Sequence, residues 1–212
     1  MDLSEIFFSI QGESAFSGLP CLFIRLAGCN LRCSYCDTTY SYQATQKKSI
    51  TEIIDTIKSL SDCKLVEITG GEPLIQKETI VLIHELHQYG YQILLETNGS
   101  ISLDDISDYA HKIVDVKCPG SGESTSFLLS NLERINPATD ELKFVLCDRH
   151  DFDWSLSQLD KWNWNAANVV FSPVYGLLSP QLLAEWILEQ NRPIRLQLQL
   201  HKYIWHPSTR GV

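Results

Sequence analysis

The sequence predicts an α/β fold, an incomplete, TIM-like barrel of alternating strands and helices. Short apolar runs rich in β-forming residues alternate with segments of helical periodicity, which is the pattern of parallel βαβ units. A complete eight-stranded barrel usually takes about 250 residues, whereas this chain has 212. Six or seven units therefore fit, and eight do not. Because α/β barrels of similar length form single units, we expect one domain over residues 1–212.

The predicted helices carry recognisable start and stop signals. The first one opens with a capping box, in which Ser49 precedes Glu52 by three residues, and continues over 50–60 with apolar residues at helical spacing. Gly90 ends the second helix, and Ser179 followed by Pro180 opens the last. The helical patterns after the first span residues 78–89, 104–111, 153–162 and 181–190. The predicted strands span residues 22–27, 65–69, 92–97, 113–117, 141–147, 169–172 and 194–200.

Composition and charge exclude several classes of function. The formal net charge of −9 argues against a nucleic-acid-binding surface, which needs a basic patch. The first residues lack the positive charge of a signal peptide, and no apolar run reaches the roughly 18 residues of a membrane span. The seven cysteines are an odd number. We therefore expect a cytoplasmic protein whose clustered cysteines serve metal binding or catalysis rather than disulfides.

Three cysteines follow the first predicted strand within eight residues, at Cys29, Cys33 and Cys36. Ligands in folds of this kind bind at the carboxyl ends of the strands. A closed zinc site takes four ligands, and an iron–sulfur cluster normally takes four thiolates, so three cysteines leave one coordination position free. A zinc site completed by a distant residue such as Cys63 or Cys118 is the alternative that spacing leaves open.

The spacing Cys-x3-Cys-x2-Cys, with aromatic Tyr35 before the last cysteine, resembles the signature of radical S-adenosylmethionine enzymes. The resemblance implies a partial (β/α)6 barrel and a [4Fe–4S] cluster on the three thiolates. The unique iron of that cluster binds S-adenosylmethionine, which is cleaved on reduction to a 5′-deoxyadenosyl radical. Gly70-Gly71-Glu72 after the second strand fits this view, because paired glycines let backbone approach a ligand and Glu72 can accept hydrogen bonds from an amino group.

Further segments resemble the 7-carboxy-7-deazaguanine synthases of 7-deazapurine (queuosine precursor) biosynthesis. They are Ser9-Ile10-Gln11-Gly12-Glu13, Phe23-Ile24-Arg25-Leu26, Cys36-Asp37-Thr38, Asp115-Val116-Lys117, His201-Lys202-Tyr203 and Arg210-Gly211-Val212. The resemblance implies conversion of 6-carboxy-5,6,7,8-tetrahydropterin into 7-carboxy-7-deazaguanine with loss of ammonia, a ring contraction that regenerates S-adenosylmethionine. It also implies an external electron donor of the flavodoxin or ferredoxin type and a homodimer.

The same resemblance assigns roles to individual residues. Thr38 ligates Mg²⁺, a hard cation that prefers oxygen ligands and orients the substrate carboxylate. Arg25 offers a bidentate fork to that carboxylate, with a salt bridge to a protein acid as the alternative. The implied S-adenosylmethionine contacts are Tyr35, Asp37, Gly71, Glu72, Asp115, Val116, Lys117, Ser172 and Pro173. The implied substrate contacts are Ile10, Gln11, Gly12, Glu13, Arg25, Thr69, His201 and Val212, the last through its carboxylate.

The sequence departs from the family pattern at a few positions. Asp115 and Val116 stand where the family often has Ser and Pro, and Ser14 stands where it usually has Gly. Two other hypotheses are consistent with the cysteines alone. One is a different small radical enzyme, such as an activase that forms a glycyl radical on a partner protein, and the other is a structural or adaptor module that binds zinc. The first would not need Arg25, Thr38 and Val212.

Overall fold

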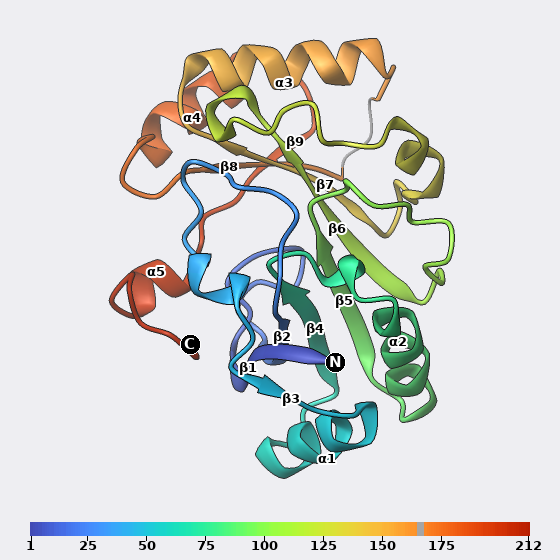
Figure 1. Cartoon of the computed structure of the whole chain (residues 1–212). Coiled ribbons are helices and arrows are strands. Elements are labelled where there is room, and N and C mark those ends of the chain that lie inside the picture. The colour runs from blue at the N-terminus through green and yellow to red at the C-terminus, as the bar shows by residue number, and fades with distance from the viewer. Residues whose placement is uncertain (165–167) are drawn as a thin grey trace.

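The computed structural model describes residues 1–164 and 168–212. Its elements follow one another along the chain as strands and helices in the alternation that the sequence predicts (Figure 1). The strands are β1 Asp2–Ile10, β2 Pro20–Leu26, β3 Gln46–Lys47, β4 Leu65–Gly70, β5 Gln92–Thr97, β6 Ala110–Lys117, β7 Glu141–Leu146, β8 Val169–Pro173 and β9 Ile194–Leu196. The α-helices are α1 Ile50–Leu60, α2 Glu78–Gln88, α3 Arg149–Lys161, α4 Pro180–Leu188 and α5 His201–Ile204. Short 3₁₀ helices are η1 Thr39–Tyr42, η2 Pro73–Ile75, η3 Pro119–Ser121 and η4 Leu129–Arg134.

All strands belong to one sheet in the order β3-β1-β2-β4-β5-β6-β7-β8-β9. From β2 to β9 every neighbouring pair is parallel, while β1 pairs antiparallel with β2 and β3 pairs antiparallel with β1. The sheet is mostly parallel and its ends do not meet, so β3 and β9 are its edges. The prediction of an α/β fold short of a closed barrel is confirmed.

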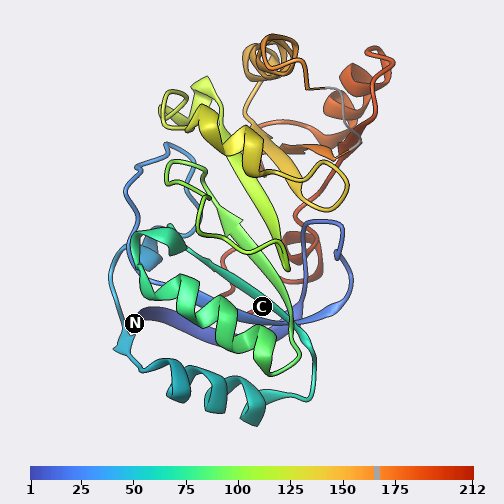
Figure 2. The same ribbon diagram turned by 90° about the vertical axis from the view of Figure 1, so that its right-hand side faces the viewer.

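Helices α1 and α2 run beside each other along one side of the sheet, and α3 and α4 cover its other end (Figures 1 and 2). Side chains alternate between the two faces of each strand, as β geometry requires. In β4, Val66 and Ile68 pack into the large apolar core against the helices, whereas Leu65 joins a smaller apolar cluster on the opposite face. That opposite, inner face carries the polar side chains of the site described below.

Most predicted elements are present, and their local signals act as expected. Ser49 and Glu52 form both bonds of the capping box at the start of α1. Gly90 follows α2 with a φ of 75°, a conformation that glycine adopts without strain. Ser179 is the residue before α4 and Pro180 takes the first helical position, although the Ser179 side chain makes no capping bond.

Three expectations need correction. Residues 104–109 form turns rather than a helix, because Ser102 and Asp104 bond each other locally and the chain from Ala110 pairs with β5. Strands β1 and β3 were not predicted; they extend the parallel sheet with an antiparallel edge. Strand β9 ends at Leu196, so the predicted strand at 194–200 is shorter. No helix within the described residues is long and apolar enough to span a membrane.

Candidate active site

The cavity of interest opens on the inner face of the sheet, toward the carboxyl ends of its parallel strands. Its wall combines these strands with the β1–β2 loop (residues 11–19), the cysteine loop (residues 28–38) and the C-terminal segment. The predicted residues that line it are Ile10, Gln11, Gly12, Glu13, Arg25, Cys29, Cys33, Tyr35, Cys36, Asp37, Thr38, Thr69, Gly71, Asp115, Lys117, His201 and Val212. Segments separated by almost the whole chain therefore meet around one space.

The cysteine loop follows β2 and is held by main-chain bonds and by side chains other than the three thiols. Gly28 N donates to Ser41 O at 2.8 Å, and Ser34 N donates to Ser121 O at 2.9 Å. The thiols of Cys29, Cys33 and Cys36 are all free and face the cavity. Three unpaired sulfurs on one short loop can converge on a single metal centre.

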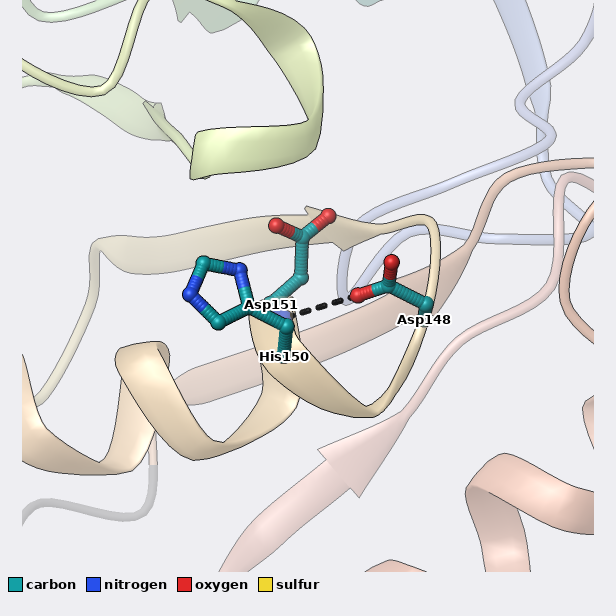
Figure 3. Close-up of side chains that lie close together, drawn as sticks. All are labelled: Asp148, His150 and Asp151. Carbon is teal, nitrogen blue, oxygen red and sulfur yellow. Dashed lines mark hydrogen bonds between the residues drawn. The ribbon is translucent and has the colours of Figure 1, made fainter.

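A second layer supports this loop from outside the cavity. The Ser34 hydroxyl donates to Gly120 O at 2.7 Å, and Gly120 N donates to the Asp151 carboxylate at 2.7 Å. Asp151 belongs to a compact group with Asp148 and His150 at the start of α3 (Figure 3). Asp148 accepts a hydrogen bond from Asp151 N at 3.0 Å and so caps the helix. The group thereby connects the helix start to the cysteine loop.

The residues around the thiols fit an iron–sulfur cluster. Burial raises the pKa of Cys33 to about 11 and also raises the pKa of Cys29, so these thiols release protons when a metal binds them. Gly71 lies against the loop so closely that a Cβ atom there would come within 2.6 Å of the Cys29 Cβ. Only glycine lets the cysteine loop pack this closely against the end of β4.

Charged groups from β6 face the same part of the cavity. Lys117 Nζ pairs with Asp115 Oδ2 at 2.7 Å, and the nearby Asp115 and Cys33 raise the pKa of the lysine despite its burial. Asp115 Oδ1 is buried and has no partner among the described residues. The Tyr35 hydroxyl donates to Val145 O at 3.2 Å, which ties the cysteine loop to β7. An unpaired carboxylate oxygen and a lysine ammonium suit a ligand that bears both an amino group and a carboxylate.

The opposite part of the cavity contains a network of charged side chains. Lys143 of β7 is 4% exposed, pairs with Glu96 of β5 at 2.7 Å and also pairs with Glu13 of the β1–β2 loop. Thr69 donates to Glu96 at 3.2 Å, and Gln199 donates to Glu13 at 3.1 Å. Attraction to Lys143 lowers the pKa of Glu13 against the opposing effect of burial. We call Gln11, Glu13, Glu67, Thr69, Glu96 and Lys143 the floor network.

Two predicted substrate contacts, Arg25 and His201, lie at the rim of this network. Arg25 Nε pairs with Glu5 Oε1 at 2.8 Å, and the Tyr40 hydroxyl donates to the same oxygen at 2.8 Å. Arg25 therefore makes a protein salt bridge while it lines the cavity. His201 packs against Gly12, whose carbonyl accepts a hydrogen bond from Leu200 N at 2.9 Å. Burial lowers the pKa of His201, which favours the neutral ring at pH 7.

Comparison with known proteins decides the family. Residues 23–119 match the model of the radical SAM superfamily. A 7-carboxy-7-deazaguanine synthase from Koribacter versatilis is 42% identical and covers 100% of both chains. One from Chlorobaculum tepidum is 43% identical and covers 100% of this chain and 97% of the relative. The chain belongs to the 7-carboxy-7-deazaguanine synthase family. It is thereby a radical S-adenosylmethionine lyase, with a [4Fe–4S] cluster and S-adenosylmethionine as cofactors.

Solved structures agree on the fold. The crystal structure of QueE from Escherichia coli matches with a TM-score of 0.77 and 24% identity over 94% of each chain. Streptococcus suis SuiB matches with a TM-score of 0.55 over 81% of this chain. Membership of the deazaguanine synthase family replaces the two other hypotheses, a glycyl-radical activase and a zinc module.

Four residues that the family pattern implied do not line the cavity. The Glu72 carboxylate is fully buried and accepts from Asn98 N at 2.7 Å, Leu74 N at 3.0 Å and the Thr97 hydroxyl at 2.9 Å. Val116 faces the helices because it alternates with Asp115 and Lys117 along β6. The remaining two are Ser172, which is buried, and Pro173, which borders a smaller hollow beside Tyr175.

The sequence analysis missed several polar residues that line the cavity. Glu67 and Lys143 each interrupt an apolar strand, and each points to the inner face, whereas Glu96 belongs to a polar strand end that the sequence already places toward the pocket. The sequence signal for such residues is a charged side chain within an otherwise apolar strand. A charge buried there is energetically costly unless it has a partner. Nothing in their spacing says that these strands place them together. Gln199 and Lys202 of the C-terminal segment also line the cavity.

Proposed function

We propose that this cavity binds 6-carboxy-5,6,7,8-tetrahydropterin beside S-adenosylmethionine and converts it into 7-carboxy-7-deazaguanine with release of ammonia. The observation that carries the proposal is that two parts of one cavity are lined by side chains of different chemistry. Three free thiols form one part, and the floor network of acids, amides and a lysine forms the other. A cluster with its cofactor suits the first part, and a flat heterocycle rich in hydrogen-bonding groups suits the second.

Cys29, Cys33 and Cys36 would hold the cluster, with its fourth position open to the cofactor. When bound, the cluster and S-adenosylmethionine supply a 5′-deoxyadenosyl radical. The residues assigned to the cofactor are Tyr35, Asp37, Gly71, Asp115 and Lys117 at the cavity wall, with Glu72, Val116, Ser172 and Pro173 behind it. Of these, Asp115 has the free carboxylate oxygen for an ammonium group, and Lys117 has the charge for a carboxylate.

The pterin would lie over the floor network. Glu13 and Glu96 offer carboxylate oxygens to the amino-pyrimidine edge, and Thr69 and His201 offer groups that donate or accept. Arg25 faces the substrate carboxylate. The remaining substrate contacts in this proposal are Ile10, Gln11, Gly12 and Val212, all of which line the cavity.

Thr38 would supply an oxygen ligand to Mg²⁺ at the border between the two parts. Its hydroxyl lines the cavity and lies 3.8 Å from Cys36 Sγ. The neighbouring Asp37 pairs with Lys202, and this attraction lowers the pKa of Asp37. Mg²⁺ keeps several of its waters and needs few protein ligands, so one threonine beside a substrate carboxylate is a sufficient site.

Other parts of the proposal concern the whole protein. We assign residues 1–212 to one domain and the protein to the cytoplasm. We also propose a homodimer and a flavodoxin- or ferredoxin-type electron donor. The single nine-stranded sheet supports the one-domain assignment, and the unpaired cysteines support the cytoplasm. The homodimer and the electron donor rest on the family alone.

Anaerobic reconstitution tests the reaction. Protein loaded with iron and sulfide, then given dithionite, S-adenosylmethionine, Mg²⁺ and the pterin, should release 7-carboxy-7-deazaguanine and ammonia in equal amounts. Omission of the pterin should stop both products. An intact cluster that cleaves S-adenosylmethionine without forming the deazaguanine would overturn the substrate assignment.

A further inference from the structure

A carboxyl group on the cavity floor has no role in the reaction proposed above. Glu67 lies in the middle of β4, lines the cavity and is 5% exposed. Its register partners in the adjacent strands are Phe23 of β2 and Leu94 of β5. Leu65, two residues earlier on the same face, belongs to the small apolar cluster with both of them. Apolar neighbours on three sides disfavour the ionised form of this carboxyl.

The cations near Glu67 are committed to other acids. Arg25 pairs with Glu5, and Lys143 pairs with Glu13 and Glu96. Among the described residues, no ion pair includes Glu67 itself. The titratable or charged groups that face it from the surrounding elements are Glu13, Cys21, Arg25, Glu96 and Lys143. Two of these are carboxylates, which oppose a third negative charge beside them.

The hydrogen bonds of Glu67 leave one oxygen for a ligand. Gln11 Nε2 donates to Glu67 Oε2, and Gln11 Oε1 accepts from Glu13 N at 3.0 Å, so both ends of this amide are engaged. No hydrogen bond from a described residue reaches Glu67 Oε1. Burial and the neighbouring Glu96 raise the pKa of Glu67 to about 8. Since Oε2 accepts from Gln11, the proton of the neutral acid belongs on Oε1.

We propose that Glu67 binds the substrate as a neutral carboxylic acid, with Oε1–H donating a hydrogen bond to an acceptor on the pterin ring. This rests on the proposed function, which places the pterin over the floor network. The ring offers nitrogen atoms and a carbonyl oxygen as acceptors. An ionised Glu67 has no proton to donate and adds a negative charge beside Glu13 and Glu96. Substrate affinity should therefore fall as this carboxyl ionises.

A binding titration tests the proposal without turnover. 6-Carboxypterin, the stable and fluorescent oxidised analogue, is titrated into the cluster-loaded protein on both sides of pH 8, the region in which Glu67 ionises. We expect the Kd of the wild type to rise about tenfold across this range, the loss of one hydrogen bond. Glu67→Gln keeps an acceptor for Gln11 and a donor for the ring, so its Kd should change only as far as ionisation of the pterin ring itself requires. The ratio of the wild-type Kd to that of Glu67→Gln should therefore rise about tenfold across this range. Glu67→Met, which has neither, should bind about tenfold more weakly at pH 7.

Each alternative outcome is decisive. If Glu67→Gln shows the same alkaline weakening as the wild type, or Glu67→Met binds as tightly at pH 7, the proposal is overturned. Infrared spectra provide a second readout. Glu72 is also partly protonated at pH 7, so the readout is the wild-type spectrum minus that of Glu67→Gln, which should contain a protonated carboxyl band that the analogue shifts. A difference spectrum without this band also overturns the proposal. Failure of the wild type to form product would defeat the proposed function alone, since the titration measures the Glu67 contact directly.

Discussion

The two parts of the cavity are built on different principles. In the cysteine loop, main-chain bonds such as Gly28 N to Ser41 O at 2.8 Å fix the backbone, and the thiols remain free. In the floor network, the side chains fix one another, as Lys143 does with Glu96 at 2.7 Å. In the cysteine loop, the groups that support the chain are therefore different from the thiols that would bind the cluster. In the floor network, the side chains that hold one another in place are the same ones that would contact the ligand.

This difference follows from what each part has to bind. Thiolates that ligate a metal cannot also be committed to protein partners, so the loop has to be supported by its main chain and by its other side chains, such as Ser34 and Tyr35. A polar heterocycle gains from donors and acceptors that are already oriented, because less ordering is then required on binding. Loss of a thiol should thus remove function and spare the fold. Loss of a floor residue should affect both.

Cys33→Ser should have the largest effect on activity. Without its thiolate the cluster lacks one of three ligands, and we expect loss of the bound iron, of the brown colour and of all turnover. The free energy of unfolding of the metal-free protein should change by less than about 0.5 kcal/mol, since Cys33 is only half-buried. The measurements are iron and sulfide content, product formation and chemical denaturation.

Cys63→Ser is the matched control for this variant. Cys63 is also half-buried, and its thiol donates to Pro20 O at 3.2 Å, a bond that a serine hydroxyl can replace. It should retain iron, colour and turnover. Equal loss of iron in both variants would contradict the assignment of the cluster to the cysteine loop.

Lys143→Met should be the most destabilising substitution in the floor network. It leaves Glu13 and Glu96 without the cation between them, and an unpaired buried charge costs about 3–5 kcal/mol. Since both carboxylates face the substrate in our proposal, kcat/KM should also fall by about two orders of magnitude, the equivalent of nearly 3 kcal/mol. Urea denaturation measures the loss of unfolding free energy, and steady-state kinetics measure the fall in kcat/KM.

Lys112→Met separates stability from function. Lys112 and Asp140 form a buried pair at 3.0 Å, and neither residue lines the cavity. The loss of unfolding free energy should be similar to that of Lys143→Met, while kcat/KM of the folded protein should stay at the wild-type value. Comparable losses of kcat/KM in both variants would mean that the floor network acts only through stability.

The contrast between the two parts also explains what could be read from the sequence. The cysteine loop and Gly71 lie in short contiguous motifs, and their chemistry needs only local spacing, so the cluster ligands could be named in advance. Glu67, Glu96 and Lys143 come from three strands, and only the register of the sheet brings them together. Likewise, β1 was missed because its partner is decided by a tertiary antiparallel pairing rather than by its own periodicity. Local sequence patterns do not show which strands pair with each other when those strands are far apart in the chain.

Glu67 should make the free energy of unfolding of the protein depend on pH. Its pKa is raised from 4.5 to about 8 on folding, so the folded protein binds this proton more tightly than the unfolded chain. The stabilisation that comes from this tighter proton binding is complete below pH 4.5 and is lost as the pH rises toward 8. In Glu67→Gln we expect the fall in unfolding free energy over this range to be smaller by on the order of 3 kcal/mol.

Part of the pH dependence should remain in that variant. Burial raises the pKa of Glu72 to about 7, so this second carboxyl also loses stabilisation as the pH rises. Denaturation curves of both proteins across this range measure the difference. Identical slopes would show that Glu67 titrates normally and that the floor carries no neutral acid.

Thr38→Ala should have the smallest effect on activity and stability. Thr38 lies at the border between the two parts of the cavity, and its side chain supports neither the cysteine loop nor the floor network. The Thr38 carbonyl accepts from Ser41 N at 2.9 Å and from the Ser41 hydroxyl at 2.8 Å, and alanine retains that carbonyl. Iron content and stability should therefore match the wild type, while activation by Mg²⁺ should weaken several-fold, or about 1 kcal/mol. Thr39→Ala, an exposed neighbour outside the cavity, should leave Mg²⁺ activation unchanged. If Thr38→Ala instead lost iron, its hydroxyl would belong to the support of Cys36, and the cysteine loop would depend on a side chain that also lines the cavity.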